Sequence, residues 1–145
     1  MSLSKKAATA ELLLQVRSCT ICSKQFYNTK NFAIVPMGFC YPGNAKSGDA
    51  PPRPECAENW MKPILEHLQS VRLTLLIGSY AQDYFLGDKK EKTLTLTVKS
   101  WATYAPEYVV LPHPSPRNNI WLKKNPWFQA EVLPYLKERI EDCMS

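Results

Sequence analysis

The pattern that most constrains the fold is a short apolar run, a glycine and a helix-forming segment in direct succession. Residues 73–77 are mostly leucine and branched side chains, Gly78 follows at once, and residues 79–86 have the composition of a helix. A buried strand that turns tightly into a helix is the start of a βαβ unit, whose next strand runs parallel to the first. Residues 108–111 form another short apolar run. The sequence therefore predicts an α/β fold with a mainly parallel sheet.

Further elements follow from apolar runs and periodicity. Residues 32–35 end at Pro36 and indicate a third buried strand. Residues 8–18 have high helix propensity, and residues 93–101 fit a helix better than a strand because of their place between two units.

Two longer helices are also expected, and each contains a proline. Residues 54–71 carry Trp60, Ile64 and Leu68 at helical spacing, and Pro63 should kink or divide them. The last helix should begin with Asn125 as its N-cap and bend or break at Pro134. Its apolar stripe consists of Phe128, Val132, Leu136 and Ile140.

Length and composition indicate one ordinary globular domain over residues 1–145. No apolar run is long enough to cross a bilayer, and Glu11, Gln15 and Arg17 interrupt the N-terminal stretch where a signal peptide needs an apolar core. A soluble cytoplasmic protein without a membrane partner is expected. The net charge of +5 favours a polyanionic partner only slightly.

Ligands of open parallel sheets bind beyond the carboxyl ends of the strands, where loops and helix N-termini meet. Three loops qualify: residues 36–54, 78–80 and 112–119. The third places His113 among three prolines and before Ser115, so an acid or base and a hydroxyl share one stiff rim. A proline-rich turn with a surface histidine is the alternative interpretation. His67, beside Glu66 on an expected helix, is most simply a surface histidine.

These loops carry a family resemblance. LPHPSPRNN resembles the His-Pro-Ser motif of the uracil-DNA glycosylase superfamily, and LLIGSYAQDYFLG resembles its third strand and following helix. VPMGFCYPGNAKSGDAPPRPECAENW is similar to the second strand with its loop and helix, and RNNIWLKKNPWF to a small bacterial branch. The resemblance runs from about Leu12 onward. It implies a three-layer α/β/α fold with a mainly parallel central sheet.

The cysteines match the layout of the iron-sulfur branches of that superfamily. There, two ligands come from an N-terminal C-x-x-C, one from the end of the second strand and one from the next helix. The resemblance assigns these roles to Cys19, Cys22, Cys40 and Cys56. Four thiolates suit a [4Fe-4S] cluster or a zinc ion, and four buried reduced cysteines with nothing bound remain an alternative. Cys143 is left over as an ordinary helical cysteine.

One part of the family pattern is missing. The first strand and its glycine-rich motif, which holds the water-activating residue, would fall in residues 23–31, and that segment is too short for them. The sheet should therefore lack one strand. Either two other strands come into contact, or an edge is left for a partner, giving a homodimer, or for a swapped segment.

The resemblance also implies a mechanism for uracil excision, in which the base is flipped and leaves as an anion. His113 matches the residue that stabilises this anion. The DNA contacts expected after it are Pro114, Ser115, Pro116, Arg117, Asn118, Lys123 and Lys124. Trp121 and Trp127 would stack on bases or, at least as often, belong to the core. Asp49 and Asp83 are nearest to the missing acidic residue by loop position, but neither matches the motif.

Two hypotheses follow. The protein is a DNA N-glycosylase of base-excision repair that acts on uracil or another deaminated base. Alternatively, it has lost catalysis and serves as a DNA-binding or structural iron-sulfur protein of the same fold.

Overall fold

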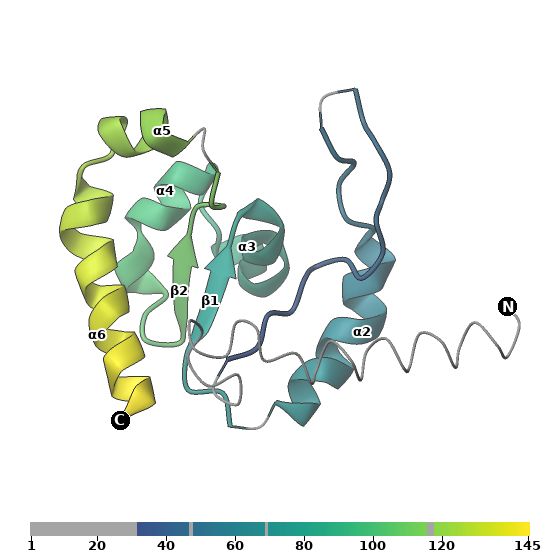
Figure 1. Ribbon diagram of the computed structural model, residues 1–145, viewed down its shortest axis with the longest axis horizontal. Helices are drawn as coiled ribbons and strands as arrows, with labels where there is room; N and C mark the ends of the chain where they lie inside the picture. The colour runs from purple at the N-terminus through teal and green to yellow at the C-terminus, as the bar shows by residue number, and fades with distance from the viewer. Residues whose placement is uncertain (1–31, 47, 69, 116–117) are drawn as a thin grey trace, which may run out of the picture. The chain divides into compact units, whose positions relative to one another are not determined.

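The computed structural model describes residues 32–46, 48–68, 70–115 and 118–145 (Figure 1). The chain divides into two compact units, residues 1–35 and 36–145. The helix expected over residues 8–18 lies outside the described residues, so that prediction is not tested. No described helix combines the length and apolarity needed to cross a membrane.

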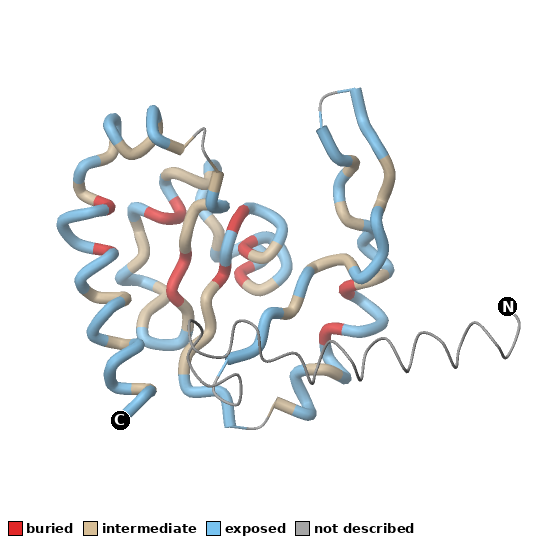
Figure 2. Tube along the Cα trace, in the orientation of Figure 1, coloured by how far each residue is buried: buried red, intermediate tan, exposed pale blue. Residues whose placement is uncertain are grey.

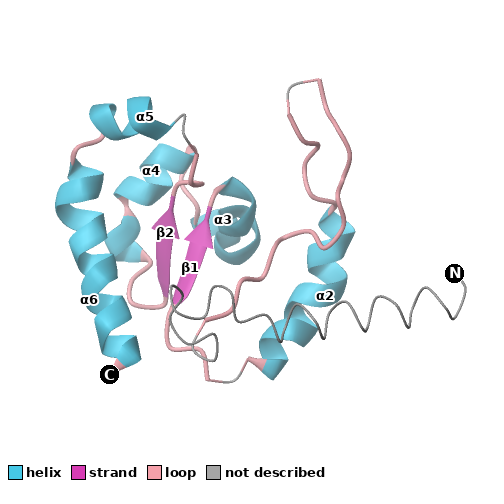
Figure 3. Ribbon diagram, in the orientation of Figure 1, coloured by secondary structure: helices cyan, strands magenta, loops and turns pink. Residues whose placement is uncertain are grey.

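The sheet in the described residues consists of two parallel strands (Figure 3). Strand β1 spans Thr74–Ile77 and strand β2 spans Tyr108–Leu111. The register pairs Thr74 with Tyr108 and ends at Ile77 with Leu111. Both strands were predicted within one residue, because short leucine- and valine-rich runs bounded by turns have few alternatives to a buried strand.

Alternate residues of the strands face two separate apolar clusters. Leu76 and Val110 pack with Leu86 of helix α3, which spans Ser79–Leu86. Leu111, one residue further along β2, packs instead against the cluster of Val98, Phe128 and Val132. Since successive side chains of a strand point to opposite faces, the two clusters lie on opposite sides of the sheet. Figure 2 shows the buried positions along both strands.

Helices therefore cover both faces, which is the predicted three-layer α/β/α arrangement. Helix α4, Leu94–Lys99, supplies Val98, and Thr93 caps it by accepting a hydrogen bond from the Leu96 amide at 3.2 Å. This confirms the helix expected over residues 93–101. Short 3-10 turns at Gly87–Lys89 and Trp101–Thr103 complete the connection from α3 to β2.

The C-terminal region departs from the prediction at its start. Helix α5, Asn118–Lys124, was not anticipated, and Asn125 donates its side-chain amide back to the Trp121 carbonyl at 2.8 Å instead of capping the next helix. A π-helical turn, Phe128–Val132, leads into helix α6, Leu133–Met144. The wider turn lies directly before Pro134, which has no amide hydrogen to donate.

Because of this π-helical turn, only part of the expected apolar stripe of the last helix is buried. Phe128 and Val132 are buried, Leu136 is half-buried, and Ile140 is 42% exposed. A π-turn adds a residue to the helical repeat, so positions beyond it rotate away from the face set by Phe128. Cys143 lies half-buried in α6 as a free thiol.

The prediction of a buried strand over residues 32–35 is wrong. Phe32 is 65% exposed and Ile34 81% exposed, and the segment has no regular secondary structure. A strand needs a neighbour for its backbone groups, and within the described ranges β1 and β2 pair only with each other. Apolar composition alone therefore did not make this segment a strand.

Helix α2 spans Pro54–His67 and is shorter than the predicted range. Ala57 and Met61 form its buried face, whereas Trp60 is 58% exposed. The helix begins at Pro54 with Ala57 inward, and Trp60 falls about 100° from Met61 around the axis. Pro63 lies on the exposed side and does not divide the helix.

Candidate functional site

The turn between β1 and α3 is built on Gly78. Its backbone angles, φ 84° and ψ 172°, belong to a region that only glycine adopts readily. The Gly78 amide donates to the Leu111 carbonyl at 2.9 Å, which ties the turn to the end of β2. The carboxyl ends of the two strands are thereby held together, at the edge where parallel sheets bind their ligands.

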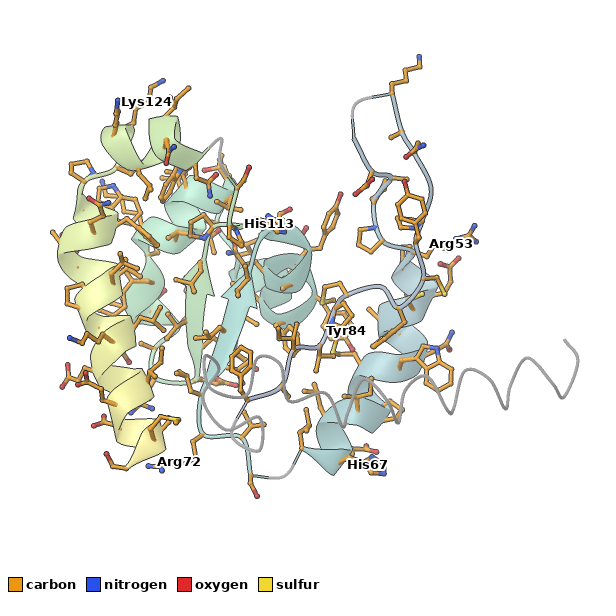
Figure 4. The ribbon with its side chains drawn as sticks, viewed as in Figure 1. Arg53, His67, Arg72, Tyr84, His113 and Lys124 are labelled. Atoms are coloured by element: carbon orange, nitrogen blue, oxygen red, sulfur yellow. The ribbon has the colours of Figure 1, made fainter. Side chains whose placement is uncertain are left out.

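His113 lies directly on this glycine. A β-carbon placed on Gly78 would stand 3.3 Å from Cβ and 3.6 Å from Cδ2 of His113. The absence of a side chain at Gly78 thus lets the histidine approach the backbone. His113 is exposed to solvent at the carboxyl ends of the strands (Figure 4). The prediction of a histidine on a stiff rim at this edge agrees with its position, while its catalytic role stays a prediction.

The loop after His113 folds back on itself through Asn118. The Asn118 side-chain amide donates to the His113 carbonyl, and its backbone amide donates to the Ser115 carbonyl at 2.9 Å. Pro114 is exposed and Ser115 half-buried. Asn118, predicted as a DNA contact, therefore closes the loop from within. Pro116 and Arg117 lie outside the described residues.

Sequence reasoning missed Gln82, which is fully buried beneath this edge. Its Nε2 donates to the Leu111 carbonyl at 2.9 Å and to the Leu76 carbonyl at 3.3 Å. Its Oε1 is buried without a hydrogen-bond partner in the described part of the chain. The available signal was position: Gln82 stands one helical turn from both Gly78 and Leu86, on the inward face of α3.

The basic and aromatic residues that follow separate into two groups. Lys123 and Lys124 are exposed in the last turn of α5, and neither forms an ion pair within the described ranges. Trp121 and Trp127 pack against the buried cluster of Phe128. Trp121 also donates its indole N–H to Thr95 Oγ1 at 2.8 Å. The core interpretation of the two tryptophans therefore holds.

A shallow depression of about 410 Å³ opens beside α5. It is lined by Asn119, Leu122, Lys123, Pro126 and Gln129. One basic side chain among amides and apolar groups suits an anionic ligand only weakly, since no second cation from the described part of the chain lines the depression. The depression thus adds little to the two exposed lysines.

Both aspartates nearest to the missing acidic position are engaged locally. Asp83 forms an ion pair with Lys90. Asp49 forms an antiparallel bridge with Asn44 and accepts a hydrogen bond from the Tyr41 hydroxyl at 3.3 Å. Each thus serves a surface pair or a loop, as expected when neither matches the family motif. That small hairpin belongs to the loop before α2, where Gly38 packs closely on Pro52.

Two of the four proposed cysteine ligands are described. Cys40 is exposed in this loop, Cys56 is half-buried in the first turn of α2, and both are free thiols. Accessible thiols are chemically suited to iron or zinc. Cys19 and Cys22 lie outside the described residues, so the arrangement of the set is not tested.

Comparison with known families decides the affiliation of the chain. The model of the uracil DNA glycosylase superfamily matches residues 5–137. The chain belongs to this superfamily. The matched range includes the Gly78 turn and the His113 loop, and it confirms the resemblance at the level of the superfamily. The iron-sulfur branch and the absence of the first motif stay predictions. Members of the superfamily act on DNA, and membership indicates a DNA glycosylase-like function.

Proposed function

We propose that the protein recognises uracil or another deaminated base in DNA and excises it as a DNA N-glycosylase of base-excision repair. The observation that carries this proposal is the seating of His113 on Gly78 at the carboxyl ends of two parallel strands. In a superfamily member, that is where a flipped base would meet the protein.

Excision breaks the bond between the base nitrogen and C1′ of the sugar, and water then adds to the positively charged sugar. The water loses a proton to solvent, and the departed base anion takes one up. The departing base carries the electron pair of that bond as an anion. A hydrogen bond from His113 to a base oxygen stabilises this charge where it develops. The side chain of His113 is exposed, so a base can approach it from solvent.

DNA contacts are proposed for the residues around this histidine. Pro114, Ser115 and Pro116 present a stiff loop to the minor groove, and Arg117, Lys123 and Lys124 neutralise phosphates. Asn118 contributes through the loop that it closes on the His113 carbonyl. The exposed lysines on α5 support this part of the proposal.

A catalytically inactive DNA-binding protein of the same fold is the second candidate. The pairing of Asp83 with Lys90 and of Asp49 with Tyr41 favours it, because each carboxylate already has a local partner and neither matches the water-activating motif of the superfamily. The two candidates share the DNA contacts and differ in whether the base leaves.

Cys19, Cys22, Cys40 and Cys56 are proposed to hold a [4Fe-4S] cluster, with zinc as the alternative ligand. A bound cluster would supply a structural cross-link between the N-terminal C-x-x-C and the start of α2. The free, accessible thiols of Cys40 and Cys56 support this proposal.

We also propose a homodimer that covers the outer edge of β1. That edge pairs with no other strand among the described residues, and an unpaired edge is open to a second chain. Analytical ultracentrifugation of the full chain tests this: a concentration-independent monomer mass would contradict it.

The experiment that tests the proposed function uses uracil-containing single- and double-stranded oligonucleotides, followed by alkaline cleavage. Wild-type protein should produce abasic sites, and His113→Ala should not. His67→Ala is the matched control, because His67 is the other histidine of the chain and lies exposed at the end of α2. Absence of product at high protein excess, with DNA binding retained, would select the inactive DNA-binding protein.

A further inference from the structure

The end of the sheet depends on one buried side chain that the proposed chemistry does not use. The carbonyl of Leu111 accepts two hydrogen bonds, from the Gly78 amide and from Gln82 Nε2, both at 2.9 Å. The same Nε2 reaches the carbonyl of Leu76 in the neighbouring strand. One amide group therefore joins the next-to-last residue of β1 to the last residue of β2.

The orientation of this amide is fixed by its partners. Both neighbours are carbonyl oxygens, which accept hydrogen bonds, so the NH₂ group must face them. Gln82 Oε1 then has no partner in the described residues although the side chain is fully buried. A buried acceptor without a partner carries a free-energy cost, which a purely apolar residue at this position would not incur. The two hydrogen bonds that Gln82 Nε2 donates to the strand carbonyls therefore explain why a polar side chain is buried here.

The donor side of Gln82 holds the backbone next to His113. Leu111 leads through Pro112 into His113, and Gly78, which shares the Leu111 carbonyl with Gln82, lies against the histidine ring. We propose that Gln82 is a positioning residue that sets the distance between the Gly78 turn and the His113 loop. It acts through backbone groups and does not contact the base. The inference rests on the proposed function only for its effect on excision.

The first test reads the position of His113 without any activity. The chain contains two histidines, His67 and His113, so the ring signals of histidine-labelled protein are resolved by NMR. Gln82→Met, which keeps the length of the side chain but removes the donor, should shift or broaden the His113 signals and leave those of His67 in place. Unchanged His113 signals would overturn the proposal.

A loss of stability alone must be distinguished from a loss of position. Val98→Ala removes methyl groups from the buried cluster on the other face of the sheet and provides the control. It should lower the melting temperature with the His113 signals unmoved. If Val98→Ala moved these signals as much as Gln82→Met does, Gln82 would be only structural.

The wild-type protein offers a measurement that needs no folded variant. The side-chain NH₂ protons of Gln82 should exchange with solvent deuterium much more slowly than those of Gln129, whose side chain is exposed. Rapid exchange at Gln82 would contradict the two hydrogen bonds.

Excision supplies the last test. Gln82→Met should lower kcat about tenfold or more with KM nearly unchanged, because misplacement of a reacting group acts on the chemical step. A loss of kcat in Gln82→Met with the His113 NMR signals unmoved would argue against action through His113. If the wild-type protein excises nothing, the proposed function fails, while the NMR and exchange results still decide the role of Gln82.

Discussion

The side chain of His113 packs on the backbone of Gly78, whose missing β-carbon would lie 3.3 Å from Cβ of the histidine. The two residues come from loops that follow neighbouring parallel strands, and both are anchored at the Leu111 carbonyl end of β2. The pairing of β1 with β2 therefore determines where the imidazole of His113 lies.

Gly78→Ala should disturb both the turn and the histidine. The backbone angles of Gly78 are disfavoured for any residue with a β-carbon, at a cost of about 1–3 kcal/mol in the free energy of unfolding. Urea denaturation measures this loss. Gly43→Ala is the matched control, since Gly43 also has a positive φ of 98° but no neighbour within 4 Å of its added carbon. Only Gly78→Ala should also abolish uracil excision, and equal excision by both variants would contradict the close contact.

Replacing Lys123 and Lys124 with alanine should weaken DNA binding equally for all sequences. Each phosphate contact releases counterions, so the slope of log K against log salt should fall by about 0.9 for each lysine that touches duplex DNA. Fluorescence anisotropy over a salt series measures it. Lys137→Ala is the control, because Lys137 is exposed on α6 and pairs with Glu141 at 3.9 Å. A salt slope unchanged by the double substitution would remove α5 from the DNA interface.

Trp121→Phe should lower stability without changing DNA affinity. The substitution removes the indole hydrogen bond to Thr95 and part of the packing on Phe128, together worth about 1–2 kcal/mol. Thermal unfolding gives the first quantity and anisotropy the second. A large loss of DNA affinity at unchanged stability would instead indicate base stacking by Trp121.

The stability of the protein should decline above pH 10, and Tyr108 should contribute to the decline. Burial raises the pKa of Tyr108 above its usual 10.0, and the hydrogen bond and negative charge of Glu107 raise it further. Below pH 10 both the folded and unfolded states hold the proton, so stability is fully present. As the pH rises through 10 towards the folded-state pKa, the unfolded chain ionises first and stability is lost.

Tyr108→Phe should flatten this part of the pH dependence. Urea unfolding of both proteins at intervals between pH 8 and about pH 11.5 gives the comparison. Tyr80→Phe is the control, since Tyr80 is 51% exposed on α3. Identical alkaline slopes for wild type and Tyr108→Phe would exclude Tyr108 as a source.

Iron, sulfide and zinc analysis after purification without oxygen should detect a cluster or a metal ion. Cys40→Ser and Cys56→Ser should each lower its content sharply, because a thiolate ligand is lost. Cys143→Ser should retain the full content, since Cys143 lies in α6 and is not among the proposed ligands. Wild-type protein free of iron, sulfide and zinc would leave the cysteines as reduced thiols.

The strands and the central helices could be predicted because the structure that the local sequence favours is also the one that packs in the fold. Residues 79–86 form a helix in a sequence that also favours one, directly after a strand with no competing structure. Residues 32–35 show the opposite case. Their apolar composition suits a strand, but pairing is a property of two segments, and a single run of residues does not reveal whether its neighbour exists.

Candidate site residues can be proposed from the sequence where a side chain has recognisable chemistry, but not where the role of a residue depends on its position in the fold. His113 could be singled out from its loop and its place after a strand. Gln82 could not, because a glutamine on a short helix is usually solvated, and only the inward phase of α3 shows that it reaches two carbonyl groups. Trp121 and Trp127 could not be assigned from the sequence, because an aromatic residue among lysines has the same sequence pattern in a core and at a DNA interface.

The π-helical turn before α6 has a consequence for how the chain tolerates insertion and deletion. Such a turn carries one residue more than the regular helix around it, while Phe128 and Val132 stay in the core. Removing an exposed residue from it, such as Gln129 or Glu131, would restore regular spacing but rotate everything after it by about 100°. Deleting even an exposed residue here would therefore change which side chains of α6 face the core.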